Sequence, residues 1–274
     1  MEDMRECLPH SMTARSDGGG ITPEAYVQMQ CDWYNATQGS LTGYDCPKCK
    51  NRGSVAVAKG GYQVMVECEC MSIRRNRQNV LQSGLQNALQ SMTFDSYVCT
   101  EPWQERAKTT AKNFADKQDG RWLYMSGQSG AGKTHLCTAV CGVLLDRGVS
   151  VRYEMWRTLY REMQRFDTRD QKFQQISDCD VLYIDDFLKS AAVKPDTENG
   201  KLARPDRDTQ KELNTAFEIV NDRYAKNKVT IISSEIFLSD LFSLDAALAG
   251  RIRERCGGFV SQISNGNSRN YRLR

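Results

Sequence analysis

The stretch GQSGAGKT at residues 127–134 has the residue types and spacing of a phosphate-binding loop, G-x-x-x-x-G-K-[ST]. It follows an apolar segment and precedes a predicted helix, which is the context that such a loop requires. Glycines let the backbone wrap around phosphate oxygens, Lys133 brings a charge to the β- and γ-phosphates, and Thr134 offers its hydroxyl to Mg²⁺. The predicted site for ATP and Mg²⁺ consists of Gly127, Gln128, Ser129, Gly130, Ala131, Gly132, Lys133, Thr134 and His135.

Two adjacent acids, Asp185 and Asp186, end a later apolar segment. Asp185 can hold the Mg²⁺ through water, and Asp186 can orient and partly deprotonate an attacking water. A third apolar segment ends in Ser234 and Glu235, which either contact the attacking water or the γ-phosphate, or are ordinary turn residues at a strand end. The paired acids favour hydrolysis over a small-molecule kinase, since a kinase must protect its phosphoryl group from water.

The stretch ALAGRIRERCG carries three arginines, Arg251, Arg253 and Arg255. On a helix, Arg251 and Arg255 share one face and Arg253 lies on another. A solvated helix face explains these charges. The functional alternative is an arginine that reaches into the ATP site of a neighbouring subunit.

Four cysteines have the spacing of metal ligands within CPKCKNRGSVAVAKGGYQVMVECECM. Apolar residues alternate on both sides of Lys59-Gly60-Gly61, which predicts a hairpin that brings the two cysteine pairs together. Four thiolates at one point suit tetrahedral Zn²⁺, although an iron–sulfur cluster stays an alternative and Cys31 could replace one ligand. A thioredoxin-like redox motif is disfavoured because no βαβ pattern follows. The predicted zinc ligands are Cys46, Cys49, Cys68 and Cys70.

The segment between the phosphate loop and the paired acids interleaves aromatic and basic residues. Trp156, Arg157, Arg161, Arg165 and Phe166 could stack on bases and neutralise phosphates of single-stranded DNA. The other interpretation is an amphipathic helix with a buried stripe of Trp156, Leu159 and Met163 and a solvated basic face.

Strands alternate with helices over the second half of the chain, which predicts a parallel sheet covered on both faces. The strands are expected at 121–126, 149–154, 180–184 and 228–233, and the helices near residues 109, 140, 160, 216 and 248. We expect a disordered segment at 1–21, a helix and zinc module at 22–71, a helical linker at 72–100, an ATPase domain at 101–274, and a mobile loop at 188–206.

The composition narrows the class of protein further. The 274 residues carry a net charge of +3, which is too small to indicate nucleic-acid binding by itself. No apolar run approaches the ~18 residues that span a membrane, and the start of the chain has no signal-peptide core. We therefore expect a cytoplasmic protein without membrane contact, in which the scattered cysteines are small core residues.

Taken in order, five stretches resemble the AAA+ ATPases of the DnaC/DnaI type, the loaders of the replicative helicase. They are GQSGAGKTHL, CDVLYIDDFLK, NDRYAKNKVTIISSE, ALAGRIRERCG and NYRLR. The resemblance covers roughly residues 92–274, and the cysteine module followed by TFDSY extends it back to about residue 44. IstB-type transposition ATPases are close relatives of these loaders, and such proteins occur on chromosomes and in phages.

The resemblance implies a five-stranded parallel sheet, ATP and Mg²⁺ binding, self-assembly around single-stranded DNA, and docking on a DnaB-like hexameric helicase. By position it implies that Lys133 and Thr134 hold phosphates and Mg²⁺, that Asp185 and Asp186 serve metal and water, that Ser234 or Glu235 is the first sensor, that Arg251 or Arg255 is the arginine finger, and that Arg272 is the second sensor.

The chain departs from the family pattern at two places. Glu235 stands where many AAA+ proteins have asparagine. Only 18 residues, 257–274, follow Cys256, which is too few for the usual helical lid. A partner or a neighbouring subunit would then have to complete the site, which predicts a slow, assembly-dependent ATPase.

We therefore predict an α/β protein, an AAA+ ATPase domain preceded by a small zinc-binding hairpin module, that loads a replicative helicase in an ATP-dependent way. An IstB-like ATPase that regulates a transposase is the first alternative. A zinc-dependent nucleic-acid-binding protein with a passive nucleotide site is the second.

Overall fold

The computed structural model describes residues 21–82, 85–117, 119–190, 197–198, 201–202, 206–264, 266 and 271. The expected disordered segment at 1–21, apart from Ile21, lies outside these ranges, as does most of the expected mobile loop at 188–206. The chain forms two compact units, one that ends at Cys68 and one that begins at Glu69. Each unit is described by itself below.

The first unit consists of one helix and one hairpin. Helix α1 (Pro23–Ala36) begins after Thr22, whose hydroxyl caps the helix by accepting a hydrogen bond from the Ala25 N–H. Strands β1 (Ser54–Lys59) and β2 (Tyr62–Glu67) pair antiparallel, and the turn between them has positive φ at Gly60 and Gly61, which glycine tolerates without strain. The predicted hairpin is confirmed.

A five-stranded parallel sheet forms the centre of the second unit, and it confirms the predicted fold class. Across the sheet the strands are β4 (Val151–Met155), β5 (Val181–Phe187), β8 (Val229–Ser234), β3 (Leu123–Gly127) and β9 (Val260–Ile263). Two short strands, β6 (Thr197–Glu198) and β7 (Lys201–Leu202), pair apart from this sheet. Because all five strands are parallel, their carboxyl ends meet at one edge, where β3, β5 and β8 lie side by side.

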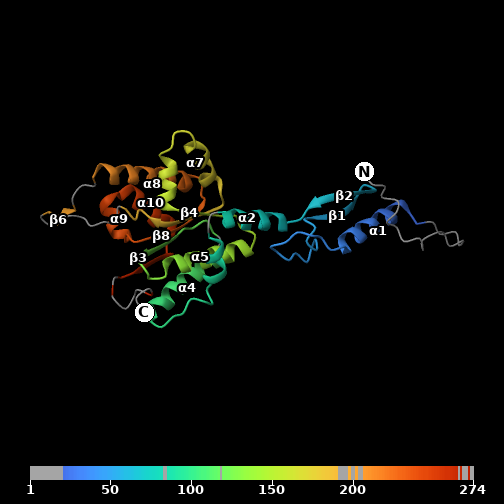
Figure 1. Cartoon of the computed structure of the whole chain (residues 1–274), viewed down its shortest axis with the longest axis horizontal. Helices are drawn as coiled ribbons and strands as arrows, with labels where there is room; N and C mark the ends of the chain where they lie inside the picture. The colour runs from blue at the N-terminus through green and yellow to red at the C-terminus, as the bar shows by residue number, and fades with distance from the viewer. Residues whose placement is uncertain are drawn as a thin grey trace. The chain divides into compact units, whose positions relative to one another are not determined.

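Helices cover both faces of this sheet (Figure 1). They are α2 (Cys70–Gln82), α3 (Gln86–Ser91), α4 (Pro102–Asp116), α5 (Lys133–Asp146), α6 (Trp156–Met163), α7 (Arg169–Asp178), α8 (Arg207–Ala225), α9 (Leu238–Leu244) and α10 (Ala246–Cys256). Alternate residues of β3 separate the two cores: Leu123 and Met125 pack with α4 and α5, whereas Trp122, next to the strand, and Tyr124 pack with α6, α8, α9 and α10. Both faces of the sheet are therefore buried.

The described part of the chain contains five elements that the sequence did not predict, namely α7, α9, β9 and the short strands β6 and β7. The expected strands at 121–126, 149–154, 180–184 and 228–233 are present with shifts of a few residues at their ends. Among the described residues, no helix has the length and apolar character needed to cross a membrane.

Candidate nucleotide and metal sites

The phosphate loop connects β3 to α5, and two of its glycines have no room for a side chain. A Cβ on Gly127 would lie 2.4 Å from the carbonyl oxygen of Ile263 in β9, and one on Gly132 would lie 2.8 Å from Cε2 of Tyr97. Both residues also have positive φ, 143° and 83°. The close packing and the left-handed backbone explain why this loop needs glycine at these positions.

Lys133, the first residue of α5, is buried and folds back beneath the loop. Its Nζ donates hydrogen bonds to the carbonyl oxygens of Gly127, at 2.7 Å, and Gln128, at 2.9 Å. Burial lowers the pKa of Lys133, so its ammonium group gains from an added negative charge. A bound phosphate would supply that charge.

Asp185 is 6% exposed, and four hydroxyl groups converge on its carboxylate. Thr134 donates to Oδ1 at 3.1 Å, Tyr183 donates to the same oxygen at 2.9 Å, Tyr153 donates to Oδ2 at 3.3 Å, and Ser233 also donates to Oδ1. Burial, followed by the nearby Asp185 carboxylate, raises the pKa of Tyr153, so this phenol stays a donor. A threonine hydroxyl beside a carboxylate at the end of a phosphate loop is the arrangement that holds Mg²⁺ in P-loop proteins.

Asp186 is half-exposed, and its side chain contacts Lys189, whereas its N–H donates to the hydroxyl of Ser233 at 3.2 Å. Its Oδ2 accepts a hydrogen bond from Nζ of Lys189 at 2.9 Å, and the same ammonium group lies 3.2 Å from Oε1 of Glu235. Sequence reasoning named Asp186 and Glu235 but missed Lys189. A basic residue three positions after an acid gives no signal of its own, because ion pairs at this spacing are common on protein surfaces.

Ser234 is fully buried, and its hydroxyl forms hydrogen bonds within the protein. It donates to the carbonyl oxygen of Phe187 at 2.8 Å and accepts from the Ile236 N–H at 3.0 Å. The pairing of β5 with β8 shifts register between Ile184 and Phe187, and this irregularity brings Phe187 opposite Ser234. Of the two residues predicted for the first sensor, the structure leaves Glu235 as the one with a side chain beside Asp186.

Residues from two regions that are distant in the sequence contact the phosphate loop and the start of α5. The Tyr271 N–H donates to the carbonyl oxygen of Gly130 at 3.0 Å, and the side chain of Gln128 exchanges two hydrogen bonds with the backbone of Gly266, at 2.8 and 2.9 Å. The ring of Tyr97 makes an edge contact with His135. Described residues after β9 therefore line the loop where the sequence predicted a missing lid.

Two of the three arginines of α10 are attached to α8 of the same chain. Arg251 donates to Oδ1 of Asn221 at 2.9 Å, and Arg255 donates to the carbonyl oxygen of Tyr224 at 2.6 Å. Arg253 is exposed. Arg272, the predicted second sensor, lies outside the described residues.

The four predicted zinc ligands lie together. The sulfur atoms of Cys46, Cys49, Cys68 and Cys70 are buried and all within 4.8 Å of one another. Those of Cys46 and Cys68 are 3.7 Å apart, which matches the edge of a tetrahedron of about 3.8 Å that follows from Zn–S bonds of about 2.3 Å. Cys31 is buried in α1 and is not part of this group.

The turn after the first cysteine pair is shaped for metal binding. Lys50 and Asn51 both adopt positive φ, 47° and 66°, which reverses the chain within a few residues. The Gly53 N–H then donates to Sγ of Cys49 at 3.3 Å, and the side chain of Asn51 accepts from the Cys46 N–H at 2.9 Å. An N–H directed at a sulfur atom stabilises a thiolate, so this turn fits a metal-bound cysteine.

The aromatic and basic segment divides into a buried and an exposed face. Trp156, Leu159 and Met163 are buried, which confirms the predicted core stripe of α6. Arg157, Arg161, Arg165 and Phe166 are exposed, and Arg165 pairs with Asp167. Trp156 is therefore unavailable for stacking on a base, whereas the arginines and Phe166 are accessible.

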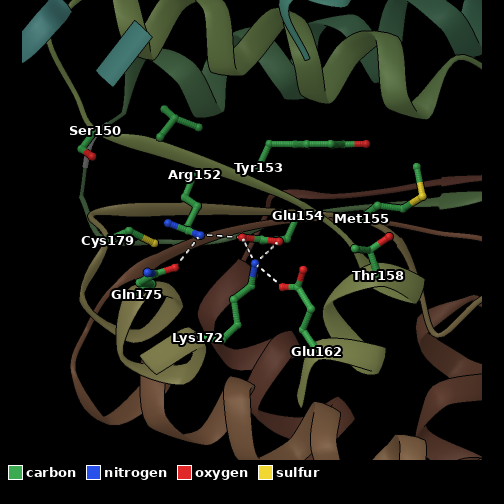
Figure 2. Close-up of a pocket in the computed structure, with 11 residues that line it drawn as sticks. Ser150, Arg152, Tyr153, Glu154, Met155, Thr158, Glu162, Lys172, Gln175 and Cys179 are labelled. Carbon is green, nitrogen blue, oxygen red and sulfur yellow. Dashed lines mark hydrogen bonds and ion pairs between the residues drawn. The ribbon is translucent and has the colours of Figure 1, made fainter. Parts of the chain in front are cut away.

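A cavity of about 630 Å³ lies beside β4, at the edge of the sheet, and not at the phosphate loop. Figure 2 shows that its charged side chains contact one another. Glu154 pairs with Arg152 at 2.7 Å and with Lys172 at 2.9 Å, and Lys172 also pairs with Glu162 at 2.6 Å. Because these charges are already compensated, the described lining of the cavity offers no unpaired charged side chain that would select an ionic ligand.

Three comparisons place the chain among known proteins. It is 28% identical over 241 residues to the phage-like element PBSX protein XkdC of Bacillus subtilis strain 168, covering 81% of this chain and 84% of that protein. It is 30% identical over 114 residues to the replicative helicase loader DnaC of Escherichia coli K12, covering 38% of this chain and 46% of DnaC. The crystal structure of DnaI superposes with a TM-score of 0.51 at 22% identity, covering 66% of this chain and 92% of DnaI.

These similarities confirm the predicted resemblance to DnaC and DnaI. No protein-family model matches the chain. The superposition on DnaI shows that the two chains share a fold, which in this chain is a five-stranded parallel sheet with the phosphate loop after β3. The alignment with DnaC covers less than half of that loader.

Proposed function

We propose that the protein is an ATP-dependent loader that places a DnaB-like hexameric helicase on single-stranded DNA during the initiation of replication. The observation that carries this proposal is the contact between Thr134 and Asp185, which brings a phosphate loop and a metal-binding acid together within a fold like that of DnaI. In this proposal Lys133 binds the β- and γ-phosphates, Thr134 and Asp185 hold Mg²⁺, and Asp186 orients the attacking water. Bound Mg²⁺ would neutralise charge on the phosphates.

We infer that Cys46, Cys49, Cys68 and Cys70 bind Zn²⁺, and that the zinc is structural. Four buried sulfur ligands fill a tetrahedral site and leave no open position for a substrate. An iron–sulfur cluster would need the same thiolates, but it would colour the purified protein and absorb visible light. The folded module is proposed to bind the helicase.

The loader is proposed to assemble on ATP and DNA, with DNA held by the exposed face of α6. Arg157 and Arg161 lie one helical turn apart, and within the described part of the chain neither guanidinium group has an ion pair or hydrogen bond to another residue. Replacing both with Ala should weaken single-strand binding and make it less dependent on salt concentration. An unchanged salt dependence would place DNA elsewhere on the protein.

The decisive experiment measures ATP hydrolysis and helicase capture together. Lys133→Ala and Asp186→Ala should each reduce hydrolysis by about 100-fold or more, because they remove a phosphate ligand and the group that orients water. Lys211→Ala is the control, since Lys211 forms an exposed ion pair with Asp208 on α8.

A pull-down with purified hexameric helicase, with and without ATP, tests the proposed partner. Capture of a transposase in place of a helicase would support the IstB-like alternative, and retained hydrolysis in both variants would contradict the assigned site.

A further inference from the structure

Lys189 holds the two acids of the nucleotide site together. Its ammonium group lies 2.9 Å from Oδ2 of Asp186 and 3.2 Å from Oε1 of Glu235, so one cation bridges the ends of β5 and β8. The hydrogen bond to Asp186 raises the pKa of Lys189, which keeps this side chain charged. Without Lys189, Oδ2 of Asp186 could accept a hydrogen bond from water.

The backbone after Asp185 is bent in a way that produces this contact. Asp186 and Leu188 both have positive φ, 53° and 54°, although neither is glycine. Phe187 and Leu188 are fully buried, so their packing holds the chain in this strained conformation. The turn is closed by a hydrogen bond from the Lys189 N–H to the carbonyl oxygen of Asp186 at 3.2 Å. Core packing therefore turns Lys189 back toward the site.

The bridge lies beside the position where the terminal phosphate is expected. Glu235, Asp186 and Lys189 are among the charged groups that act on the Lys133 ammonium, which is the group that binds the β- and γ-phosphates in such loops. The side chain of Lys189 is half-exposed, and its ammonium group is held by the ion pairs with Asp186 and Glu235. A bound phosphate would compete with these two carboxylates for the ammonium group.

We propose that Lys189 is a positioning residue. Without nucleotide it restrains Asp186, and when ATP binds its side chain moves so that the ammonium group pairs with the γ-phosphate. This inference rests on the proposed ATP hydrolysis at the same site. The γ-phosphate carries more negative charge than one carboxylate and presents several oxygens, so it competes well for a charge-assisted hydrogen bond. This movement of Lys189 frees Asp186 to orient water only when a γ-phosphate is present. ADP lacks that phosphate and leaves the bridge intact.

The test compares two ligands and one reaction in the full-length protein. Dissociation constants for AMPPCP, an ATP analogue that is not hydrolysed, and for ADP are measured by fluorescence titration. Single-turnover hydrolysis is measured at saturating ATP without DNA or partner protein. Lys189→Met removes the charge and keeps the length of the side chain, Lys189→Arg keeps the charge, and Lys211→Met controls for loss of an exposed lysine that pairs with an acid three positions away.

Lys189→Met should weaken AMPPCP binding by about fivefold and ADP binding by less than about twofold, because only the γ-phosphate contact is lost. Its hydrolysis rate at saturation should rise several-fold, since Asp186 is no longer restrained. Lys189→Arg should keep the dissociation constant for AMPPCP near that of the wild type, because it retains the charge. Lys211→Met should resemble the wild type in both dissociation constants and in the hydrolysis rate.

Two results would overturn the inference. Equal changes for AMPPCP and ADP, including no change, would show that Lys189 does not meet the γ-phosphate. A hydrolysis rate that falls in Lys189→Met would show that the lysine assists the reaction and does not restrain it. Failure of the proposed function gives a different result, since a wild-type protein that binds neither AMPPCP nor ADP would contradict the nucleotide site itself. Thermal unfolding of each variant checks that the fold is retained.

Discussion

Between Ile21 and Cys68, the buried apolar residues of the first unit are four cysteines and one alanine, Ala56. In the second unit, packed aromatic and aliphatic side chains cover both faces of a five-stranded sheet. The first unit also exposes large apolar side chains, including Trp33 at 60% and Tyr62 at 75%. A unit of this size that buries so little apolar surface needs another source of stability, and metal binding can supply it. We therefore expect the first unit to depend on a bound metal for its stability and the second unit to depend on its apolar core.

Removing the metal is the strongest way to break this comparison. Cys49→Ser, or a strong chelator, should abolish the metal content and unfold the hairpin, because structural zinc contributes about 10–16 kcal/mol to the folding of comparable small modules. ADP binding by the second unit should persist. The measurements are elemental analysis, limited proteolysis of the first unit and nucleotide titration. Cys31→Ser is the control, since Cys31 is a buried cysteine outside the cluster. A hairpin that resists proteases without metal would show that packing suffices.

A core substitution should produce the reverse result. Trp156 is fully buried, its ring contacts Phe187 with centroids 4.9 Å apart, and its Nε1 donates to Glu212. Trp156→Ala should destabilise the second unit by about 3–5 kcal/mol, as measured by urea unfolding, while the metal content stays the same. The fully exposed Phe166 provides the matched aromatic control, with an expected change within about 0.5 kcal/mol. Loss of metal in Trp156→Ala would show that the two units do not fold separately.

The smallest effect on stability is expected on the exposed face of the hairpin. Val57 and Val64 are cross-strand partners on one face and are 41% and 39% exposed. Replacing both with Ser should change the free energy of unfolding by no more than about 0.5 kcal/mol per site and leave the metal in place. Helicase capture should fall if this face is the docking surface, whereas Gln63→Ser, on the other face, should have no effect on capture. Destabilisation of the module would show that these side chains contribute to its folding.

The sequence predicted the features that depend on neighbouring residues or on a repeated spacing. The phosphate loop, the hairpin and the buried stripe of α6 all follow from patterns of residues close together in the chain. Helix α7 was missed because its sequence, RDQKFQQISD, has few apolar residues, and only Ile176 and Ser177 of this helix are buried. Strand β9 was missed because it is short and only partly buried apart from Ile263.

Within the candidate site, the missed features depend on backbone geometry. The sequence does not reveal the register shift between β5 and β8 that turns the Ser234 hydroxyl toward Phe187. The contact of Lys189 with Asp186 likewise depends on two left-handed residues, which the letters DDFLK do not reveal because neither is glycine. The attachment of Arg251 and Arg255 to α8 joins segments that only the fold brings together. Pattern reasoning found the residue types of the site but not the directions of their side chains.

The hydrogen bond between the Tyr271 N–H and Gly130 has a practical consequence for anyone who purifies this protein. An affinity tag or fluorophore attached next to Tyr271 would lie close to the phosphate loop. Such a fusion could shift the apparent affinity for nucleotides without altering any residue of the loop. Nucleotide-binding constants should therefore be compared between tagged and tag-free protein before any variant is interpreted.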